Sequence, residues 1–204
     1  KDEPLPDTYE QVETWAQWID QGTGPGASLP TFSTLGYDDQ QAHTPSVDIP
    51  CRGAIIGDPA IIEPAYQAVK AAGHPTCAYG GMRPATGLLL TEEDGVGPRA
   101  LAWTQYKHGV DRWFIWNGTY YDDYQSGSGP TDVFKQAKTF GGFDELDAEI
   151  GETGWNYTNG DGVLFYPGND EVFPESSYDN AGPIASLRLK LWRRGLQDVD
   201  YLTL

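Results

Sequence analysis

Residues 99–118 read RALAWTQYKHGVDRWFIWNG, and this stretch decides the fold class. Helix-forming residues fill the segment 99–108, and Gly109 supplies the conformational freedom that commonly ends a helix. The following segment, 111–118, is dense in aromatic residues, which favour β-strands. A helix is thus followed directly by a strand, the order expected of an α/β protein.

The same alternation extends along the rest of the chain. Strands are predicted at 29–35, 47–57 and 76–81, and a helix is predicted from about Pro64 to Ala72. A final long helix is predicted to open at Gly182-Pro183. Strands and helices that alternate at this spacing predict parallel strands joined by crossover helices.

Two folds share this arrangement, the open doubly wound sheet and the closed (β/α)8 barrel of the TIM type. No Gly-x-Gly-x-x-Gly segment or phosphate-binding loop follows any predicted strand, which argues against the open nucleotide-binding sheet. A whole barrel takes about 250 residues, whereas the 204 residues here supply only about four strand–helix units. Half of a barrel, cut from a longer protein, fits best.

Composition excludes several classes of function. The formal net charge is −17, from 30 acidic and 13 basic residues, and such a charge repels the phosphates of nucleic acids. No apolar run reaches the roughly 18 residues of a membrane-spanning helix. The histidines and cysteines show no metal-ligand spacing. Cys51 and Cys77 fit either a disulfide or two buried thiols.

Candidate functional residues follow the predicted strands, because parallel α/β folds carry their functional side chains in the loops after the carboxyl ends of strands. At these positions lie Asp2, Glu3, Tyr37, Tyr79, Arg83, Trp116 and Tyr121. Aromatic faces stack on sugar rings, and carboxylates bind hydroxyls and supply acid chemistry. A carbohydrate site is therefore favoured over a nucleotide site. Loops packed for structural reasons, or a protein interface, explain the same residues equally well.

Asp2-Glu3-Pro4 is the sharpest short element. Neighbouring residues on a strand point to opposite faces, so both carboxylates serve one site only where the strand ends and bends. Pro4 supplies that break and is expected to restrict Glu3 to extended conformations. An acidic cap at the start of the following helix is the competing explanation.

A longer signature lies at the other end of the chain. It comprises 159–168 (NGDGVLFYPG), 182–190 (GPIASLRLK) and 194–202 (RGLQDVDYL). Asp2-Glu3-Pro4, Arg83-Pro84-Ala85, the helix 99–108 and the segment 113–116 (WFIW) precede it in the same order. Together these elements resemble the bacterial uncharacterised domain family 4091, which includes the catalytic domain of glycoside hydrolase family 123.

The resemblance implies a TIM-type barrel in which residues 1–204 run from the end of strand 4 to helix 8 of one domain. It also implies retaining, substrate-assisted hydrolysis of 2-acetamido sugar glycosides of the N-acetylgalactosaminide type. Glu3 would be the general acid, with a pKa raised by burial, and Asp2 would stay ionised and orient the acetamido N–H. The acetamido oxygen of the substrate attacks, so no metal or cofactor is implied.

The partners that follow from this interpretation are a glycan and the remaining N-terminal half of the barrel. Tyr37, Tyr79, Arg83, Trp116 and Tyr121 are assigned to substrate binding. We expect a bacterial, exported protein, located in the periplasm or outside the cell. Most of the broader family has no demonstrated activity, so a non-catalytic carbohydrate-binding barrel and a structural or assembly protein remain alternative functions.

Two charged residues inside the signature have structural explanations. Arg188 is expected to pair with a carboxylate within the fold. Asp161, which lies between two glycines, is expected to form a turn.

Overall fold

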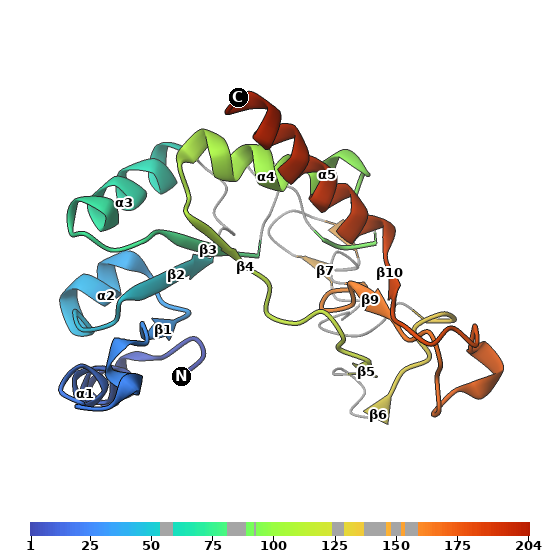
Figure 1. Ribbon diagram of the computed structural model, residues 1–204, viewed down its shortest axis with the longest axis horizontal. Helices are drawn as coiled ribbons and strands as arrows, with labels where there is room; N and C mark the ends of the chain where they lie inside the picture. Colours follow the sequence, from blue (N-terminus) through green and yellow to red (C-terminus); the bar gives the residue numbers. More distant parts are fainter. Residues whose placement is uncertain are drawn as a thin grey trace. The chain divides into compact units, whose positions relative to one another are not determined.

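The computed structural model describes residues 1–53, 59–80, 89–91, 93–123, 129–136, 146–147, 152–153 and 159–204. The chain divides into two compact units (Figure 1). The first unit comprises Lys1–Thr86 and Thr104–Phe114, and the second comprises Gly87–Trp103 and Ile115–Leu204. Each unit is described by itself below.

The first unit is built on a four-stranded sheet. Its strands are β1 (Phe32–Ser33), β2 (Ile49–Gly53), β3 (Cys77–Tyr79) and β4 (Arg112–Phe114). They lie in the order β1-β2-β3-β4, and every neighbouring pair is parallel. This arrangement confirms the predicted α/β class with parallel strands.

Helices connect the strands in the expected way. The helices are α1 (Tyr9–Asp20), α2 (Tyr37–His43), α3 (Pro59–Ala71) and α4 (Val96–His108), and α2, α3 and α4 each follow one strand and lead into the next. Helix α3 begins earlier than predicted and keeps Pro64 in its interior. Short 3-10 turns at Pro6–Thr8 and Pro25–Ser28 flank α1.

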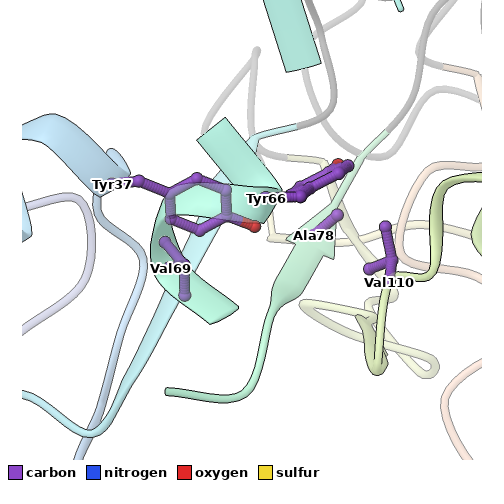
Figure 2. Packing of buried hydrophobic residues seen from close by; sticks show 5 residues of the cluster. All are labelled: Tyr37, Tyr66, Val69, Ala78 and Val110. Atoms are coloured by element: carbon purple, nitrogen blue, oxygen red, sulfur yellow. The ribbon is translucent and has the colours of Figure 1, made fainter. Parts of the chain in front are cut away.

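One face of the sheet packs against helices. Ala78 of β3 is fully buried in a cluster with Tyr37 of α2, Tyr66 and Val69 of α3, and Val110, which precedes β4 (Figure 2). Trp113 packs against the same cluster. Burying these aromatic and aliphatic side chains stabilises the contact between the sheet and its crossover helices.

The opposite face carries a different set of side chains. Strand alternation and register place the following residues on it: Phe32, Ile49, Cys51, Cys77, Tyr79 and Phe114. The rings of Phe32 in β1 and Phe114 in β4 lie only 5.0 Å apart between centroids. In a flat sheet, three strand spacings alone would separate their backbones by about 14 Å, and their register offset would add to this distance. The sheet is therefore strongly curved, and we call this inner side the concave face.

A disulfide joins Cys51 and Cys77 on the concave face. The two residues are direct register partners in β2 and β3. Both are fully buried together with Ile49, and Tyr79 and Phe114 pack against this group. Of the two states compatible with the sequence, the structure contains the disulfide.

Two identical Thr–Asp pairs link strands at their amino ends. Thr31 donates its N–H and hydroxyl to Asp48 Oδ2 at 2.7 and 2.9 Å, and its hydroxyl accepts the Asp48 N–H. Thr76 and Asp111 repeat this reciprocal pattern, with both donations to Asp111 Oδ2 at 2.8 Å. The pairs join β1 to β2 and β3 to β4 at the end of the sheet that conventionally serves stability rather than function.

In its described residues, the second unit contains three short antiparallel strand pairs, the first part of α4 and a long final helix. The pairs are β5 (Asp122–Asp123) with β6 (Gly129–Pro130), β7 (Leu146–Asp147) with β8 (Glu152–Thr153), and β9 (Phe165–Tyr166) with β10 (Ile184–Ala185). Helix α5 spans Leu187–Leu202, and a 3-10 turn lies at Pro174–Ser176. The helix predicted from Gly182-Pro183 thus starts later, because Ile184 pairs with Tyr166 and the Ser186 hydroxyl caps the helix by accepting the Leu189 N–H at 3.1 Å.

Arg188 holds the signature segment of the second unit together. Its guanidinium is buried and donates to the carbonyl oxygens of Leu89, Gly160 and Val163 at 2.6 to 2.7 Å. The expected carboxylate pairing stays a prediction; among the described residues, the charge of Arg188 acts on Asp161 and lowers the pKa of that carboxyl. These carbonyls belong to irregular segments, where backbone groups depend on contacts outside helices and sheets for their hydrogen bonds.

The described residues show no helix that is long and apolar enough to cross a membrane. Within the same residues, no group of three or more His, Cys, Asp or Glu side chains is arranged to hold a metal ion.

Candidate functional site

Asp2 and Glu3 lie beside the carboxyl end of β1. The Ser33 hydroxyl donates to the Lys1 carbonyl oxygen at 3.2 Å, so the first residues run alongside this edge strand. Thr34, the residue directly after β1, contacts both acidic residues. The acid pair is thus found at the end of the sheet where parallel α/β proteins carry their functional groups.

The Thr34 hydroxyl bridges the two acids. It donates to Asp2 Oδ1 at 2.6 Å and accepts the backbone N–H of Glu3 at 2.6 Å. Thr34 is buried, with 6% of its surface exposed. Hydrogen bonds that involve a carboxylate are stronger than neutral ones, so this hydroxyl fixes Asp2 relative to the Glu3 backbone.

Glu3 adopts an uncommon backbone conformation. Its φ angle is +39°, in the left-handed region. The prediction that Pro4 restricts Glu3 to extended conformations was therefore wrong. Outside glycine, such angles carry strain and persist only where surrounding contacts impose them. The contacts at Glu3 are the N–H bond to Thr34 and a side-chain bond to Tyr79.

Tyr79, the last residue of β3, donates its hydroxyl to Glu3 Oε1 at 2.6 Å. Burial raises the pKa of Tyr79 well above its ordinary value, and the hydrogen bond to Glu3 and the charges of Glu3 and Asp2 raise it further. Tyr79 is therefore a protonated donor at all moderate pH values. Its ring meets Phe114 edge-on at 6.1 Å between centroids.

The two carboxyl groups are themselves exposed. The burial expected for Glu3 as a general acid is not found in this chain. The arrangement therefore contains the Asp2 carboxylate, bound by the buried Thr34 hydroxyl, and the Glu3 carboxylate, bound by the Tyr79 phenol. The Tyr79 ring in turn packs against Phe114 on the concave face. Such a group can exchange a proton with a ligand and balance a positive charge.

Tyr37 lies away from this arrangement. Only 1% of its surface is exposed, its hydroxyl donates to the Cys77 carbonyl oxygen at 2.5 Å, and its ring meets Tyr66 edge-on (Figure 2). Burial raises the pKa of this hydroxyl above the ordinary value. A side chain so enclosed between sheet and helices cannot reach a ligand, so Tyr37 is assigned to the core rather than to substrate binding.

Trp116 and Tyr121 belong to the second unit. Trp116 is 38% exposed, donates its indole N–H to Asp161 Oδ1 at 3.0 Å and lies 5.2 Å from the Tyr120 ring. Tyr121 is half-buried and donates its hydroxyl to the Phe165 carbonyl oxygen at 2.9 Å. Their assignment to substrate binding stays a prediction. Arg83 lies outside the described residues.

Two residues, Thr34 and Asp161, were not among the predicted site residues but have specific hydrogen-bonding environments. Thr34 was overlooked because a lone threonine after a strand carries no distinctive pattern. Asp161 forms the expected turn, flanked by Gly160 and Gly162 at φ +72° and +75°, but it also accepts the Trp116 indole. Burial raises the pKa of Asp161, and the hydrogen bonds from Trp116 and Gly162 and the charge of Arg188 oppose this effect.

Comparison with known proteins yields a likeness of fold. No protein-family model matches the sequence, and no curated protein matches it. A solved structure with a similar fold is that of a family 123 glycoside hydrolase from Clostridium perfringens, described for its hydrolysis of glycolipid glycans. The TM-score is 0.55 at 17% sequence identity, and the match covers 99% of this chain and 30% of the hydrolase. The chain therefore spans less than a third of that protein's length.

Proposed function

We propose that this chain is the carboxyl-terminal part of a TIM-type (β/α)8 barrel that hydrolyses glycosides of 2-acetamido sugars. The observation that carries the proposal is the linked group of Asp2, Thr34, Glu3 and Tyr79 at the carboxyl ends of parallel strands. The fold similarity to a family 123 glycoside hydrolase supports it. The signature at 159–202 supports it independently of the acid pair.

In the proposed reaction the acetamido oxygen of the substrate attacks its own anomeric carbon while the glycosidic bond breaks. Glu3 gives its proton to the leaving oxygen, and Asp2 accepts the acetamido N–H and balances the charge of the oxazolinium-like intermediate. Water then opens the intermediate and returns a proton to Glu3. Tyr79 donates to the Glu3 carboxylate formed in the first step, which is the hydrogen bond present in the structure.

The barrel assignment rests on the two faces of the sheet. Crossover helices pack against one face, whereas the described cluster on the concave face consists of strand residues, and Phe32 on that face is 41% exposed. In a closed barrel this face is the interior, filled by side chains from all eight strands. We propose that the N-terminal half of the barrel packs against it and, with a bound sugar, covers Glu3.

A non-catalytic carbohydrate-binding barrel is the second candidate. The observation in its favour is the exposure of Glu3, because a general acid usually depends on burial for its proton affinity. Exposed Trp116 would serve such a protein as a stacking surface for a sugar ring.

The disulfide supports a proposed location outside the cytoplasm. Bonds such as Cys51–Cys77 persist in oxidising compartments and are rare where glutathione keeps thiols reduced. A periplasmic or extracellular protein is consistent with this bond and with access to glycans.

The test is turnover by the intact parent protein on a panel of aryl glycosides, with Glu3→Gln compared with wild type. The expected result is release of the 2-acetamido sugars by wild type and a loss of about 100-fold or more in kcat for Glu3→Gln, with sugar binding retained. Glu10→Gln is the matched control, because Glu10 is an exposed carboxylate on α1. Sugar binding without turnover by the wild-type protein would favour the second candidate.

A further inference from the structure

The inference concerns how the acid pair is held, and it rests on the proposed function. Asp2 and Glu3 are adjacent in sequence, yet two adjacent extended residues would direct their side chains to opposite faces. In the structure, Glu3 departs from the extended conformation with φ +39°. Some contact must impose this change and set the angle between the two side chains.

Thr34 is the residue that contacts both acids at once. A hydroxyl has one proton to donate and two lone pairs to accept with. The Thr34 hydroxyl donates a hydrogen bond to Asp2 Oδ1 and accepts one from the backbone N–H of Glu3. Each of the two hydrogen bonds is 2.6 Å long. One hydroxyl can serve both groups, because the Asp2 carboxylate accepts a hydrogen bond and the Glu3 backbone N–H donates one.

The position of Thr34 makes the bridge rigid. The residue follows β1 directly and is 6% exposed, so its side chain has little freedom and water competes weakly for its hydroxyl. Neighbouring Ser33 provides a contrast. It is also buried, at 1% exposure, but its hydroxyl donates to the Lys1 carbonyl oxygen and to neither carboxylate.

We propose that Thr34 is a positioning residue that sets the mutual orientation of Asp2 and Glu3. It keeps Asp2 directed at the acetamido N–H of the substrate and keeps the Glu3 backbone in the conformation that presents its carboxyl group to the leaving oxygen. Selectivity for 2-acetamido sugars over 2-hydroxy sugars then depends on Thr34 as well as on Asp2. Thr34 itself touches no reacting atom.

The experiment compares Thr34→Val, Thr34→Ser and Ser33→Ala in the intact parent protein. Thr34→Val keeps the shape and removes both hydrogen bonds, and Thr34→Ser restores the hydroxyl. A displacement on the order of 1 Å at a catalytic group costs about 100-fold in rate. The expected result for Thr34→Val is a kcat roughly 10- to 100-fold lower on an aryl 2-acetamido glycoside, with KM changed by less than about 3-fold. Thr34→Ser recovers most of the loss, and Ser33→Ala stays within about 3-fold of wild type.

A crystal structure of Thr34→Val provides a readout that does not depend on turnover. The expected result is a Glu3 φ angle that returns to a negative value and an Asp2 carboxylate that has moved away from its wild-type position. Should Thr34→Val fail to fold, Thr34→Cys takes its place, because a thiol is a weak donor and acceptor.

The outcomes separate the two proposals. A wild-type protein without turnover overturns the proposed hydrolysis, and the geometry of Glu3 in the variant then decides the role of Thr34. A wild-type protein with turnover, combined with unchanged kinetics and an unchanged Glu3 conformation in Thr34→Val, overturns the positioning role alone.

Discussion

The hydroxyl of Tyr79 donates a hydrogen bond of 2.6 Å to Oε1 of Glu3, across 76 positions of sequence. This bond joins the last residue of β3 to the segment that runs beside β1, two strands away. It brings a strand-end aromatic residue and an acidic residue of the candidate site together. The relationship also has a consequence for the behaviour of the protein at alkaline pH.

Tyr79→Phe is expected to reduce the alkaline sensitivity of the fold. The pKa of Tyr79 is raised in the folded protein, first by burial and then by Glu3, so its stabilising contribution is complete below about pH 10, the value of an unfolded tyrosine. That contribution is lost as the pH rises from there toward the folded pKa. Urea unfolding at a series of pH values above 9 should therefore show a shallower decline for Tyr79→Phe than for wild type.

Glu3→Gln tests whether the Glu3 carboxylate raises the pKa of Tyr79. Without the Glu3 carboxylate, the pKa of Tyr79 should fall toward the level set by burial and by the charge of Asp2. A tyrosinate absorbance titration of Glu3→Gln against Glu3→Gln/Tyr79→Phe would detect this fall. Identical titrations of Tyr79 in wild type and Glu3→Gln would show that the two side chains are not coupled.

Asp111→Asn is expected to lower stability at neutral pH but not in acid. Burial alone would raise the pKa of Asp111, but the hydrogen bonds from the Thr76 N–H and hydroxyl outweigh it and hold the pKa below the ordinary value. The stabilisation is present above about pH 4 and is lost as the pH falls through the folded pKa. We expect a loss of about 1 kcal/mol at pH 7, since the carboxylate is partly solvated.

The measurement for Asp111→Asn is urea unfolding at neutral pH and near pH 2.5. Asp20→Asn is the control, because Asp20 is an exposed carboxylate at the end of α1. A difference between wild type and Asp111→Asn that is as large in acid as at neutral pH would contradict the role of the charged form.

Arg188→Met is expected to destabilise the second unit. The substitution removes the guanidinium partner of the buried Gly160 and Val163 carbonyls and of the partly buried Leu89 carbonyl. The expected loss is roughly 3 kcal/mol in the free energy of unfolding. Arg193→Met on the same helix is the control, since Arg193 is exposed. Equal unfolding midpoints for the two variants would rule out the anchoring role.

Reduction of the Cys51–Cys77 disulfide is expected to cost roughly 3 kcal/mol, from the chain entropy of the loop that it closes. Unfolding midpoints should fall on adding dithiothreitol to wild type and should not change for the double variant Cys51→Ser/Cys77→Ser. Thiol labelling of the unfolded, unreduced protein provides a direct check. Two reactive thiols in that sample would mean that the bond does not form.

Sequence patterns predicted the sheet of the first unit well. Alternating strand and helix signals placed all four parallel strands, because buried strands and their capped crossover helices leave strong local patterns. The short strands of the second unit were not predicted. Two-residue pairs such as β9 with β10 depend on contacts between distant segments and have no periodicity of their own.

The candidate site was predictable only in part. Strand-end position drew attention to Tyr79 and Tyr37 alike, but Tyr79 is on the concave face and Tyr37 begins α2 and turns into the core. Which way a side chain points depends on register and helix packing, which single residues do not reveal. Thr34 acts through two hydrogen bonds to residues about 30 positions away, and no local signal marks them.

The most direct test of the central claim, that Glu3 protonates the leaving group in a reaction at this acid pair, is a leaving-group series. The rates of the intact wild-type protein and of Glu3→Gln are measured on aryl 2-acetamido glycosides whose phenols range from acidic to weakly acidic. Proton donation matters most for the poorest leaving group, so the loss in Glu3→Gln should grow steeply as the phenol becomes less acidic. A loss of equal size for every phenol, or no loss at all, would contradict the assignment of Glu3 as the acid.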